Sequence, residues 1–490
     1  MKKSLVSILL CLLFAGATPV SAQGFLKDLK NKAGKTLKDA GRSLSPASTS
    51  AAKAGASTST KASSSATDSS NASDEADETP DALKGIHHGS IDDLMLFPAP
   101  QTTASTVRIT VENDMPAISS FYDGAAYIYS YPQKAFFIDK KGRKLFETDM
   151  AQSDLARMPR FEQGVFMEIP SQSVKKPICI RDKQGRVVKE FPKASSATQF
   201  KDGKAIIVED EINYMHTVRY VDTKGNYIYP DLSYKVKSLY LPSLESANRK
   251  TSEGLTAFCI KNGNNDDWKW GFYNSLGKIA IAADYDAVGD FHDGLAAVMK
   301  VDNGVARWGF IDKNGRQVIA PRFTVKPSDF DSGYSLVIDK AGDGYYMDRS
   351  GQFKLGPVHK YPAGKDGNYV YISPFHNGYA VVGVEVKETY GHSVYFFTVD
   401  ANLNRLGWAK LTTSLDMTCQ DFICYEGRYY IKQNYGGGDR WMQINPRNFD
   451  RIGEGDTNIF SDGLRLYNRS QNGFVNDNNE LVIVVEESKF

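Results

Sequence analysis

The sequence predicts an all-β repeat array that forms a propeller-like closed ring of antiparallel hairpin units, with an open β-solenoid as the alternative. Two residue patterns recur along the chain, which indicates a repeated structural unit. The composition agrees, because the 26 Tyr and 26 Phe side chains suit pleated strands and the 41 Gly suit turns that need a positive φ. One hairpin cannot bury its own apolar face, so we expect neighbouring units to stack and share a core.

The first pattern is a short element with a fixed glycine, as in "FHDGLAAV". Its nine copies place this glycine at Gly124, Gly164, Gly203, Gly254, Gly294, Gly333, Gly378, Gly427 and Gly463. The shortest interval is 36 residues, from Gly427 to Gly463, and the longest is 51, from Gly203 to Gly254. A unit of about 40 residues with insertions at some joints is typical of propeller blades.

The second pattern is an apolar run that ends at Asp or Asn, with Gly or Asn three positions later, as in "WGFIDKNG". The pairs are Asp139 with Gly142, Asp182 with Gly185, Asp222 with Gly225, Asn274 with Gly277, Asp312 with Gly315, Asp348 with Gly351, Asn445 with Asn448, and Asn476 with Asn479. The first residue accepts backbone N–H bonds, and the last suits the left-handed conformation of a bulged hairpin turn. We interpret these residues as turn formers, because a catalytic carboxylate is not expected in every repeat. Asp400 lacks the partner and has Leu403 instead.

Each unit is predicted to hold three or four short antiparallel strands, such as "GLAAVMKV", "RWGFID" and "RQVIAP". Trp270 and Trp308 are predicted to pack between repeats. The β-patterned segment "STVRITVE" precedes the first unit, and "ELVIVVEE" ends the last. If these terminal strands meet in one blade or in neighbouring blades, no exposed sheet edge is left. We therefore favour a closed ring over a solenoid.

Three segments precede the repeats. Residues 1–22 are predicted to be a signal peptide, since two lysines precede an apolar run and small residues precede a cut between Ala22 and Gln23. Residues 23–44 are predicted to form a basic amphipathic helix. This helix either contacts a membrane surface or a partner peripherally, or is a solvated helix with no role in isolation. Residues 45–102, rich in Ser, Ala and Thr, are predicted to be a disordered linker, and residues 103–490 the repeat domain of about nine units.

The signal peptide predicts an exported protein, in the periplasm or at the cell surface, with no transmembrane helix in the mature chain. The balance of 59 Lys and Arg against 58 Asp and Glu argues against a nucleic-acid partner. Four cysteines follow the signal peptide, and we favour free thiols over a disulfide between Cys419 and Cys424. We find no metal-site spacing and no hydrolase or nucleotide-binding motif, and so predict no metal, no cofactor and no catalytic residues.

Three aromatic residues are candidates for binding. Tyr435 and Trp441 flank a glycine-rich turn in "YGGGDRW", where an exposed ring suits stacking on a sugar or a peptide. Trp441 also takes the place of Trp308 in its unit, so packing between repeats is the favoured interpretation for it. Trp408, in "LGWAK", has no structural role in the repeat pattern and is the third candidate.

Residues 254–351, which include "WKWGFYNSLGKIAIAADY" and "RWGFIDKNGRQVIAPRF", resemble the WG-containing repeat, or KWG repeat, of bacterial envelope proteins. The Trp-Gly pair itself occurs at Trp270 and Trp308, and in the other units the spacing alone carries the resemblance. The resemblance implies β-rich repeats and an interaction role, and it supplies no catalytic residues. We therefore expect an exported, envelope-associated binding or scaffolding protein for a protein or a glycan. The alternatives are a hydrolase of envelope polysaccharide and a purely structural envelope protein.

Overall fold

The computed structural model describes the repeat domain and the short segments before it. The chain divides into two compact units, Met1–Asp81 and Ala82–Phe490, and all described residues belong to the second. The described residues are 85–89, 99–112, 116–132, 134–150, 158–170, 174–210, 215–236, 247–261, 268–358, 371–388, 391–412, 419–434, 439–453, 458–468 and 472–488. The predicted signal peptide with Ala22 and Gln23, the amphipathic helix and most of the linker lie outside them.

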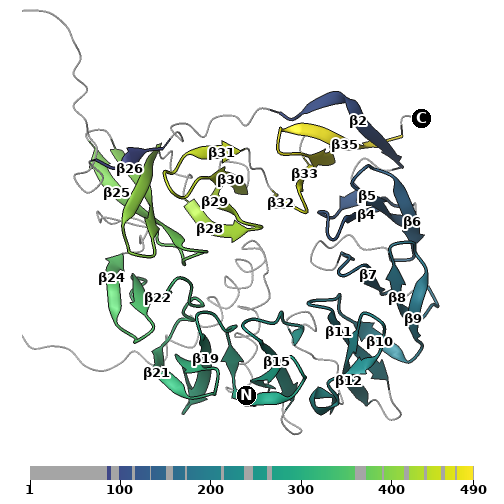
Figure 1. Ribbon diagram of the computed structural model, residues 1–490, viewed down its shortest axis with the longest axis horizontal. Coiled ribbons are helices and arrows are strands. Elements are labelled where there is room, and N and C mark those ends of the chain that lie inside the picture. Colours follow the sequence, from purple (N-terminus) through teal and green to yellow (C-terminus); the bar gives the residue numbers. More distant parts are fainter. Residues whose placement is uncertain are drawn as a thin grey trace, which may run out of the picture. The chain divides into compact units, whose positions relative to one another are not determined.

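Nine small sheets of three to five strands follow one another as the blades of a propeller (Figure 1). Blade 1 holds β3 (Ala117–Ile118), β4 (Ala125–Tyr129), β5 (Ala135–Asp139) and β6 (Lys144–Thr148); blade 2 holds β7 (Val165–Glu168), β8 (Ile178–Asp182) and β9 (Val187–Phe191). Blade 3 holds β10 (Ala194–Ala197), β11 (Lys204–Asp210), β12 (His216–Asp222), β13 (Tyr227–Ile228) and β14 (Tyr234–Val236), with the 3₁₀ turn η4 (Pro230–Leu232).

The middle blades keep the same strand order. Blade 4 holds β15 (Leu255–Lys261), β16 (Trp268–Asn274) and β17 (Ile279–Tyr285); blade 5 holds β18 (Ala287–Val288), β19 (Leu295–Asp302), β20 (Val305–Asp312) and β21 (Gln317–Phe323). Blade 6 holds β22 (Tyr334–Ile338), β23 (Gly344–Asp348) and β24 (Phe353–Val358).

Two of the last three blades, blades 7 and 9, also include a strand from the N-terminal side. Blade 7 holds β25 (Tyr379–Glu388), β26 (Gly391–Asp400), β27 (Arg405–Thr412) and the added β1 (His87–His88). Blade 8 holds β28 (Cys419–Tyr425), β29 (Arg428–Asn434), β30 (Asp439–Ile444) and β31 (Arg451–Gly453). Blade 9 holds β32 (Phe460–Ser461), β33 (Leu464–Asn468), β34 (Asn472–Val475), β35 (Glu480–Glu487) and β2 (Gln101–Val111).

The ring closes where β2 meets β35. These strands pair in parallel with Val107 opposite Ile483 and Val111 opposite Glu487, so the first long strand of the repeat domain completes the last blade (Figure 1). The predicted closed ring is confirmed, and the two terminal strands share one blade. Part of the 45–102 range belongs to the propeller, because β1 and the first two residues of β2 lie within it.

The apolar core lies between consecutive blades, where rings from adjacent sheets pack edge to face. Phe272 meets Phe291 across blades 4 and 5 with ring centroids 4.7 Å apart, and Phe310 meets Phe330 across blades 5 and 6 at 4.9 Å. Phe474 meets Phe121 at 4.6 Å across the closing joint. The joint between the last and first blades is therefore packed like the others.

Each of the nine fixed glycines closes a two-residue turn directly before a strand of its blade, such as β4 in blade 1 and β7 in blade 2. In the first copy Asp123 and Gly124 have φ of 51° and 79°, and Tyr122 and Ala125 exchange backbone hydrogen bonds of 2.9 and 3.2 Å. Positive φ at both central residues is the type I′ hairpin turn, which Asp-Gly and Asn-Gly favour. All nine copies have positive φ at the fixed glycine and at the residue before it.

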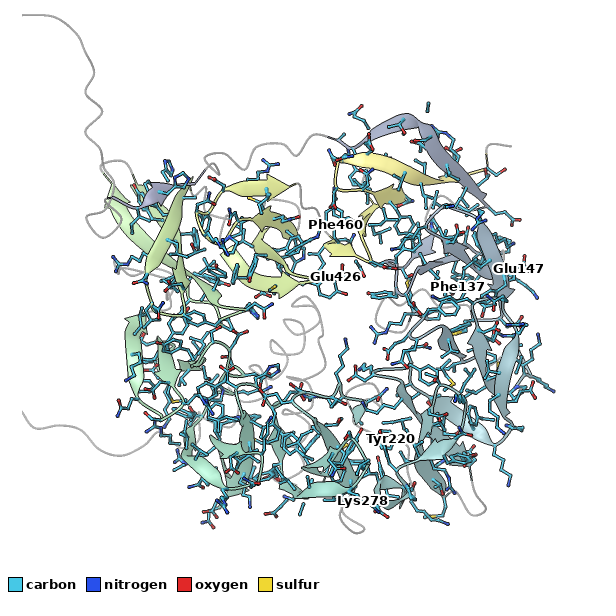
Figure 2. All side chains as sticks on the ribbon, in the orientation of Figure 1. Phe137, Glu147, Tyr220, Lys278, Glu426 and Phe460 are labelled. Carbon is cyan, nitrogen blue, oxygen red and sulfur yellow. The ribbon has the colours of Figure 1, made fainter. Side chains whose placement is uncertain are left out.

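These turns form a belt around the ring. The Asp123 carboxylate accepts the N–H of Gly164 in the next blade at 2.6 Å, and Asp293 accepts that of Gly333 at 2.6 Å. The belt also crosses the closing joint, where Asp462 accepts the N–H of Gly124 at 2.5 Å. Figure 2 shows Glu426, a member of this belt, on the inner side of the ring. The fixed glycine therefore serves contact between blades as well as the turn.

Two substitutions within the belt are compensated by the preceding residue. Blade 2 has Gln163 before its glycine, and Glu162 instead accepts the N–H of Gly203 at 2.8 Å. Blade 6 has Ser332 there, and Asp331 accepts the N–H of Asn377 at 2.8 Å. In blades 2 and 6 a carboxylate is thus kept in reach of the next blade although the usual position lacks one.

The bulged turns of the second sequence pattern lie at the same joints as the belt. At Asp312, Oδ1 accepts the N–H of Asn314 and of Arg316 at 2.9 Å each, and Gly315 has a φ of 77°. The same turn is present at Asp139 with Gly142, Asp222 with Gly225, Asn274 with Gly277 and Asp348 with Gly351, where the glycine N–H donates to the Asp or Asn carbonyl at 2.8 to 2.9 Å. The lysine after Asp312, Lys313, then reaches back to Glu253 of the previous blade at 2.9 Å.

We expect Asp293→Ala to destabilise the propeller by about 1 kcal/mol more than Asn303→Ala. Both substitutions place alanine at positive φ before a glycine of blade 5, with φ of 49° at Asp293 and 48° at Asn303. Only Asp293 bonds to the next blade in this way, through the Gly333 N–H. Urea denaturation of both variants checks the difference, and equal losses would show that the belt adds nothing beyond the turn.

Candidate binding site

The three predicted binding aromatics have different surroundings. Trp408 is 7% exposed, its ring stacks on His88 with centroids 4.0 Å apart, and its Nε1 donates to the Ile86 carbonyl at 3.2 Å. Because strand β1 and the core of blades 6 and 7 cover this ring, Trp408 is not an exposed stacking platform. Trp441 is half-buried beside Lys432, whose Nζ lies 5.7 Å from the ring centre, and Tyr435 lies outside the described residues.

The repeat tryptophans lie within the packed joints. Trp308 is 3% exposed, and Trp270 is half-buried against the clusters on both sides of blade 4. The glycine after Trp308 has a steric reason, because a Cβ on Gly309 would lie 2.5 Å from the carbonyl oxygen of Ile319 and 2.8 Å from the nitrogen of Pro321. The Trp-Gly pair thus lets the outer strand bulge closely over the third strand.

A cavity of about 550 Å³ opens between blades 8 and 9. Its lining residues are Arg428, Gln443, Arg451, Ile452, Phe460, Arg465, Asn476, Asp477, Asn478 and Asn479. They come from the second, third and outer strands of blade 8 and from the first two strands and the Asn476–Asn479 turn of blade 9. None of these residues was predicted as a ligand contact; Asn476 and Asn479 were predicted as turn formers.

The cavity is present because this joint departs from the repeat. Two residues before the turn Asp or Asn, seven other blades carry a buried aromatic or aliphatic side chain, as in the Phe310–Ile319 pair of blade 5, and blade 7 carries the buried Thr398. Blade 8 has Gln443 opposite Gly453 at the same places. A bulky apolar pair is thereby replaced by one polar side chain and a glycine, which leaves unfilled space beside Phe460.

The facing blade departs from the repeat as well. Two residues after the fixed glycine, four blades carry fully buried alanines: Ala126, Ala205, Ala296 and Ala380. Blade 9 has Arg465 there, and this side chain is only 2% exposed. A buried guanidinium is larger than the alanine methyl group and carries a charge, so Arg465 departs from the repeat in both size and charge. Comparison of the nine units position by position would have found this signal in the sequence.

Two arginines flank Phe460, which Figure 2 shows on the inner side of the ring. The guanidinium carbons of Arg428 and Arg465 lie 4.8 and 5.9 Å from the ring centre. Arg428 also donates to both carboxylate oxygens of Asp477, at 2.7 and 2.9 Å, and this hydrogen bonding raises the pKa of Arg428. Cations over an aromatic face and a bidentate carboxylate pair hold the guanidinium groups in fixed places.

The lining is positively charged. Its three arginines and one aspartate leave two formal positive charges (3 − 1 = 2). Asp477 is the one carboxylate among the described lining residues, and Arg428 already pairs with it. Hydrolysis of a glycosidic bond by paired carboxylates needs two such groups on either side of the bond. The arrangement therefore suits the binding of an anionic ligand.

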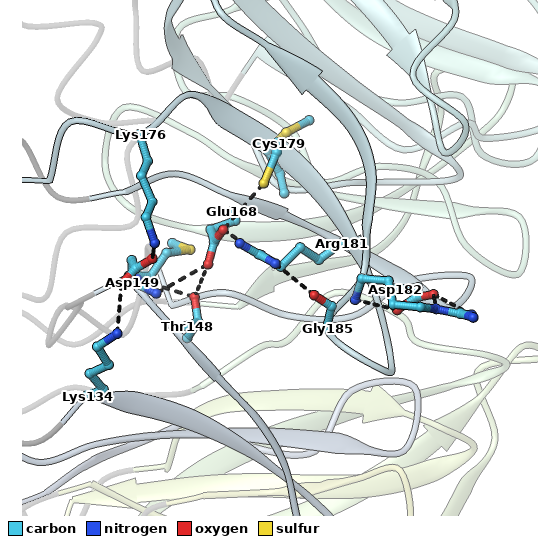
Figure 3. Close-up of polar contacts among 12 residues, drawn as sticks. Lys134, Thr148, Asp149, Glu168, Lys176, Cys179, Arg181, Asp182 and Gly185 are labelled. Carbon is cyan, nitrogen blue, oxygen red and sulfur yellow. Dashed lines mark hydrogen bonds and ion pairs between the residues drawn. The ribbon is translucent and has the colours of Figure 1, made fainter.

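A second cluster of chemically active side chains lies between blades 1 and 2 (Figure 3). Glu168 is 1% exposed and accepts from Thr148 at 2.6 Å, from the Asp149 N–H at 3.2 Å, from Arg181 at 2.6 Å and from Cys179 at 3.3 Å. Burial and the nearby Glu168 charge together raise the pKa of the Cys179 thiol to about 12. A protonated thiol is a poor nucleophile, and the Glu168 carboxylate is already occupied by hydrogen bonds from four groups. We therefore interpret this cluster as a structural contact that joins two blades.

The described residues contain no group of three or more His, Cys, Asp and Glu side chains arranged to hold a metal ion. Among the same residues, no helix is long and apolar enough to span a membrane. Cys179, Cys259 and Cys424 are free thiols.

Comparisons with known proteins agree with the repeat pattern. A family model described as "WG containing repeat" matches residues 270–303 and 308–338. No curated protein sequence matches the chain significantly.

Solved structures similar to this chain include a eukaryotic initiation factor, with 13% identity over 74% of this chain and 93% of that chain and a TM-score of 0.43. BamB from Moraxella catarrhalis has 10% identity over 66% and 84%, with a TM-score of 0.26. The β-propeller domain of the Trilobed protease from Pyrococcus furiosus has 10% identity over 56% and 87%, with a TM-score of 0.29. The two family-model matches cover the later part of blade 4, most of blade 5 and the start of blade 6, within the range 254–351 whose residues resemble this repeat.

Proposed function

We propose that this protein is an exported, envelope-associated binding or scaffolding protein that uses its propeller as a platform for a protein or a glycan. The propeller repeat fold is compatible with such a platform. The signal-peptide pattern of residues 1–22 supports export, and the basic pattern of residues 24–44 supports peripheral contact with a membrane surface. Periplasmic or surface location is part of this proposal.

One observation carries the assignment of a binding role to the joint between blades 8 and 9. Gln443 with Gly453 stands where blade 5 has the buried Phe310–Ile319 pair, and Arg465 stands where four other blades have buried alanines. Cavities in a core cost stability, and so does a buried charge. A joint that combines a cavity of about 550 Å³ with a buried arginine is best explained by a ligand at that joint.

The test is crosslinking in intact cells followed by envelope fractionation. The unaltered chain is expected to enrich a specific envelope partner or glycan. The double variant Gln443→Phe with Gly453→Ile restores the apolar pair of the repeat, so it should keep the fold and lose the ligand. Arg307→Ala removes an exposed arginine of blade 5 and is the matched control.

Two results would contradict the proposal. If the repeat-restoring variant recovers the same partner, the cavity is not the binding site. Clean fractionation of the unaltered chain with no enriched partner would favour a purely structural protein. Thermal unfolding of each purified variant separates loss of the ligand from loss of the fold.

A further inference from the structure

We infer that the cavity between blades 8 and 9 binds a saccharide unit that bears a carboxylate or a phosphate. This inference rests on the proposed binding function and names the class of ligand. It follows from the charge, the hydrogen-bonding groups and the size of the cavity.

The charge selects an anion. Arg451 and Arg465 line the cavity together with Arg428, and the guanidinium fork matches the paired oxygens of carboxylates and phosphates. The Arg428–Asp477 pair is an example of this match within the cavity itself, with both oxygens bound at 2.7 and 2.9 Å. Arg465 is 2% exposed, and a low-dielectric setting strengthens its attraction for an anion that enters the cavity.

The remaining lining selects a sugar. Gln443 and the amides of Asn478 and Asn479 offer both donors and acceptors, which suit the hydroxyl groups of a saccharide, while the Asn476 amide is bonded within its own turn. Ile452 is 61% exposed and contributes an apolar surface at the cavity, where a sugar ring can lie against it. A simple inorganic anion would use the arginines and leave the amide row and this apolar surface without a role.

The size selects one small unit over a protein surface. The volume of about 550 Å³ lies within the range of small-molecule pockets, roughly 300 to 1,000 Å³. A stable protein partner needs a broader contact area of about 800 Å² on each side. A concave site of this size fits one or two sugar units of a longer acidic glycan.

Isothermal titration calorimetry of the full-length mature chain tests the inference. Its four small-molecule probes are glucuronate, glucose 6-phosphate, glucose and inorganic phosphate. We expect glucuronate or glucose 6-phosphate to bind at least tenfold more tightly than glucose and than phosphate alone. The comparison of the first two probes tells which anionic group the site prefers. A tetraglutamate peptide is the fifth probe and stands for an acidic protein partner.

Variants assign the binding to the cavity. Arg451→Ala and Arg465→Gln are each expected to weaken the preferred probe about tenfold or more, since each removes a charged hydrogen-bond donor. Arg307→Ala should leave the affinity unchanged. If Arg465→Gln lowers the thermal midpoint, Arg451→Ala carries the test, because Arg451 is only half-buried.

Several results would overturn the inference. If glucose binds as tightly as the anionic sugars, the site does not require an anionic group. If inorganic phosphate binds as tightly, the site does not require a sugar. Tighter binding of tetraglutamate would show that the ligand is an acidic protein segment. If no probe binds while crosslinking still recovers a partner that the repeat-restoring variant loses, the ligand class is wrong and the proposed function stands. If neither experiment shows binding, both are wrong.

Discussion

Glu168→Ala is expected to lower the free energy of unfolding by about 3 kcal/mol, because breaking a buried ion pair by removing one partner leaves the other charge uncompensated. Glu168 is 1% exposed and Arg181 is 20% exposed, so water replaces the lost carboxylate only in part (Figure 3). The Thr148 hydroxyl and the Cys179 thiol lose their acceptor at the same time. The loss would weaken the joint between blades 1 and 2, since Thr148 comes from one and Glu168 from the other.

Urea denaturation of two companion variants gives the comparison. Glu190→Ala removes an exposed carboxylate from the neighbouring strand β9 and is expected to change stability by less than about 0.5 kcal/mol. Glu168→Gln keeps the volume and an acceptor oxygen but loses the charge, so an intermediate loss is expected. Equal midpoints for Glu168→Ala and Glu190→Ala would contradict the role of the buried pair.

Gly309→Ala is the second large change, with an expected loss of about 3 kcal/mol. The added methyl carbon would lie 2.5 Å from the Ile319 oxygen and 2.8 Å from the Pro321 nitrogen. Both are backbone atoms, so the clash is relieved only if strand β21 moves away from β20. The apolar pair of Phe310 and Ile319 lies beside this contact and would shift with it.

Gly304→Ala is the matched control in the same blade. Gly304 has a φ of 79° and no atom within 4 Å of an added Cβ, so alanine there meets backbone strain of about 1 kcal/mol and no clash. Thermal or urea denaturation of the two variants should therefore differ by roughly 2 kcal/mol. A larger loss at Gly304 than at Gly309 would show that the Trp-Gly pair has no steric basis.

The sequence predicted the period of the fold well, because the period depends on local chemistry. Asp312 and Gly315, like their equivalents in other units, mark a bulged turn by their residue types alone. The nine fixed glycines likewise predict nine units. The closing strands were also predictable, since each carries a β pattern without a unit of its own. Contacts between blades were not predictable in this way, because residues such as Asp123 and Gly164 are far apart in sequence and meet only across a joint.

The candidate site was missed for a related reason. Tryptophan and tyrosine attracted attention as chemical types, yet Trp408 is covered by β1, a segment far away in the chain. Gln443 and Gly453 are ordinary residues in isolation. They become informative only when they are compared with Phe310 and Ile319 at the same positions of another blade.

The pairing of β2 with β35 has a consequence for how the protein folds during synthesis. Strand β2 is made before any blade, yet its partner strand appears only when the last blade is complete. Contacts between residues so distant in sequence form slowly, and the edge of β2 stays unpaired until then. The ring is therefore expected to close in a single late step. A chain interrupted at any blade would keep an unpaired strand edge that can pair with another chain.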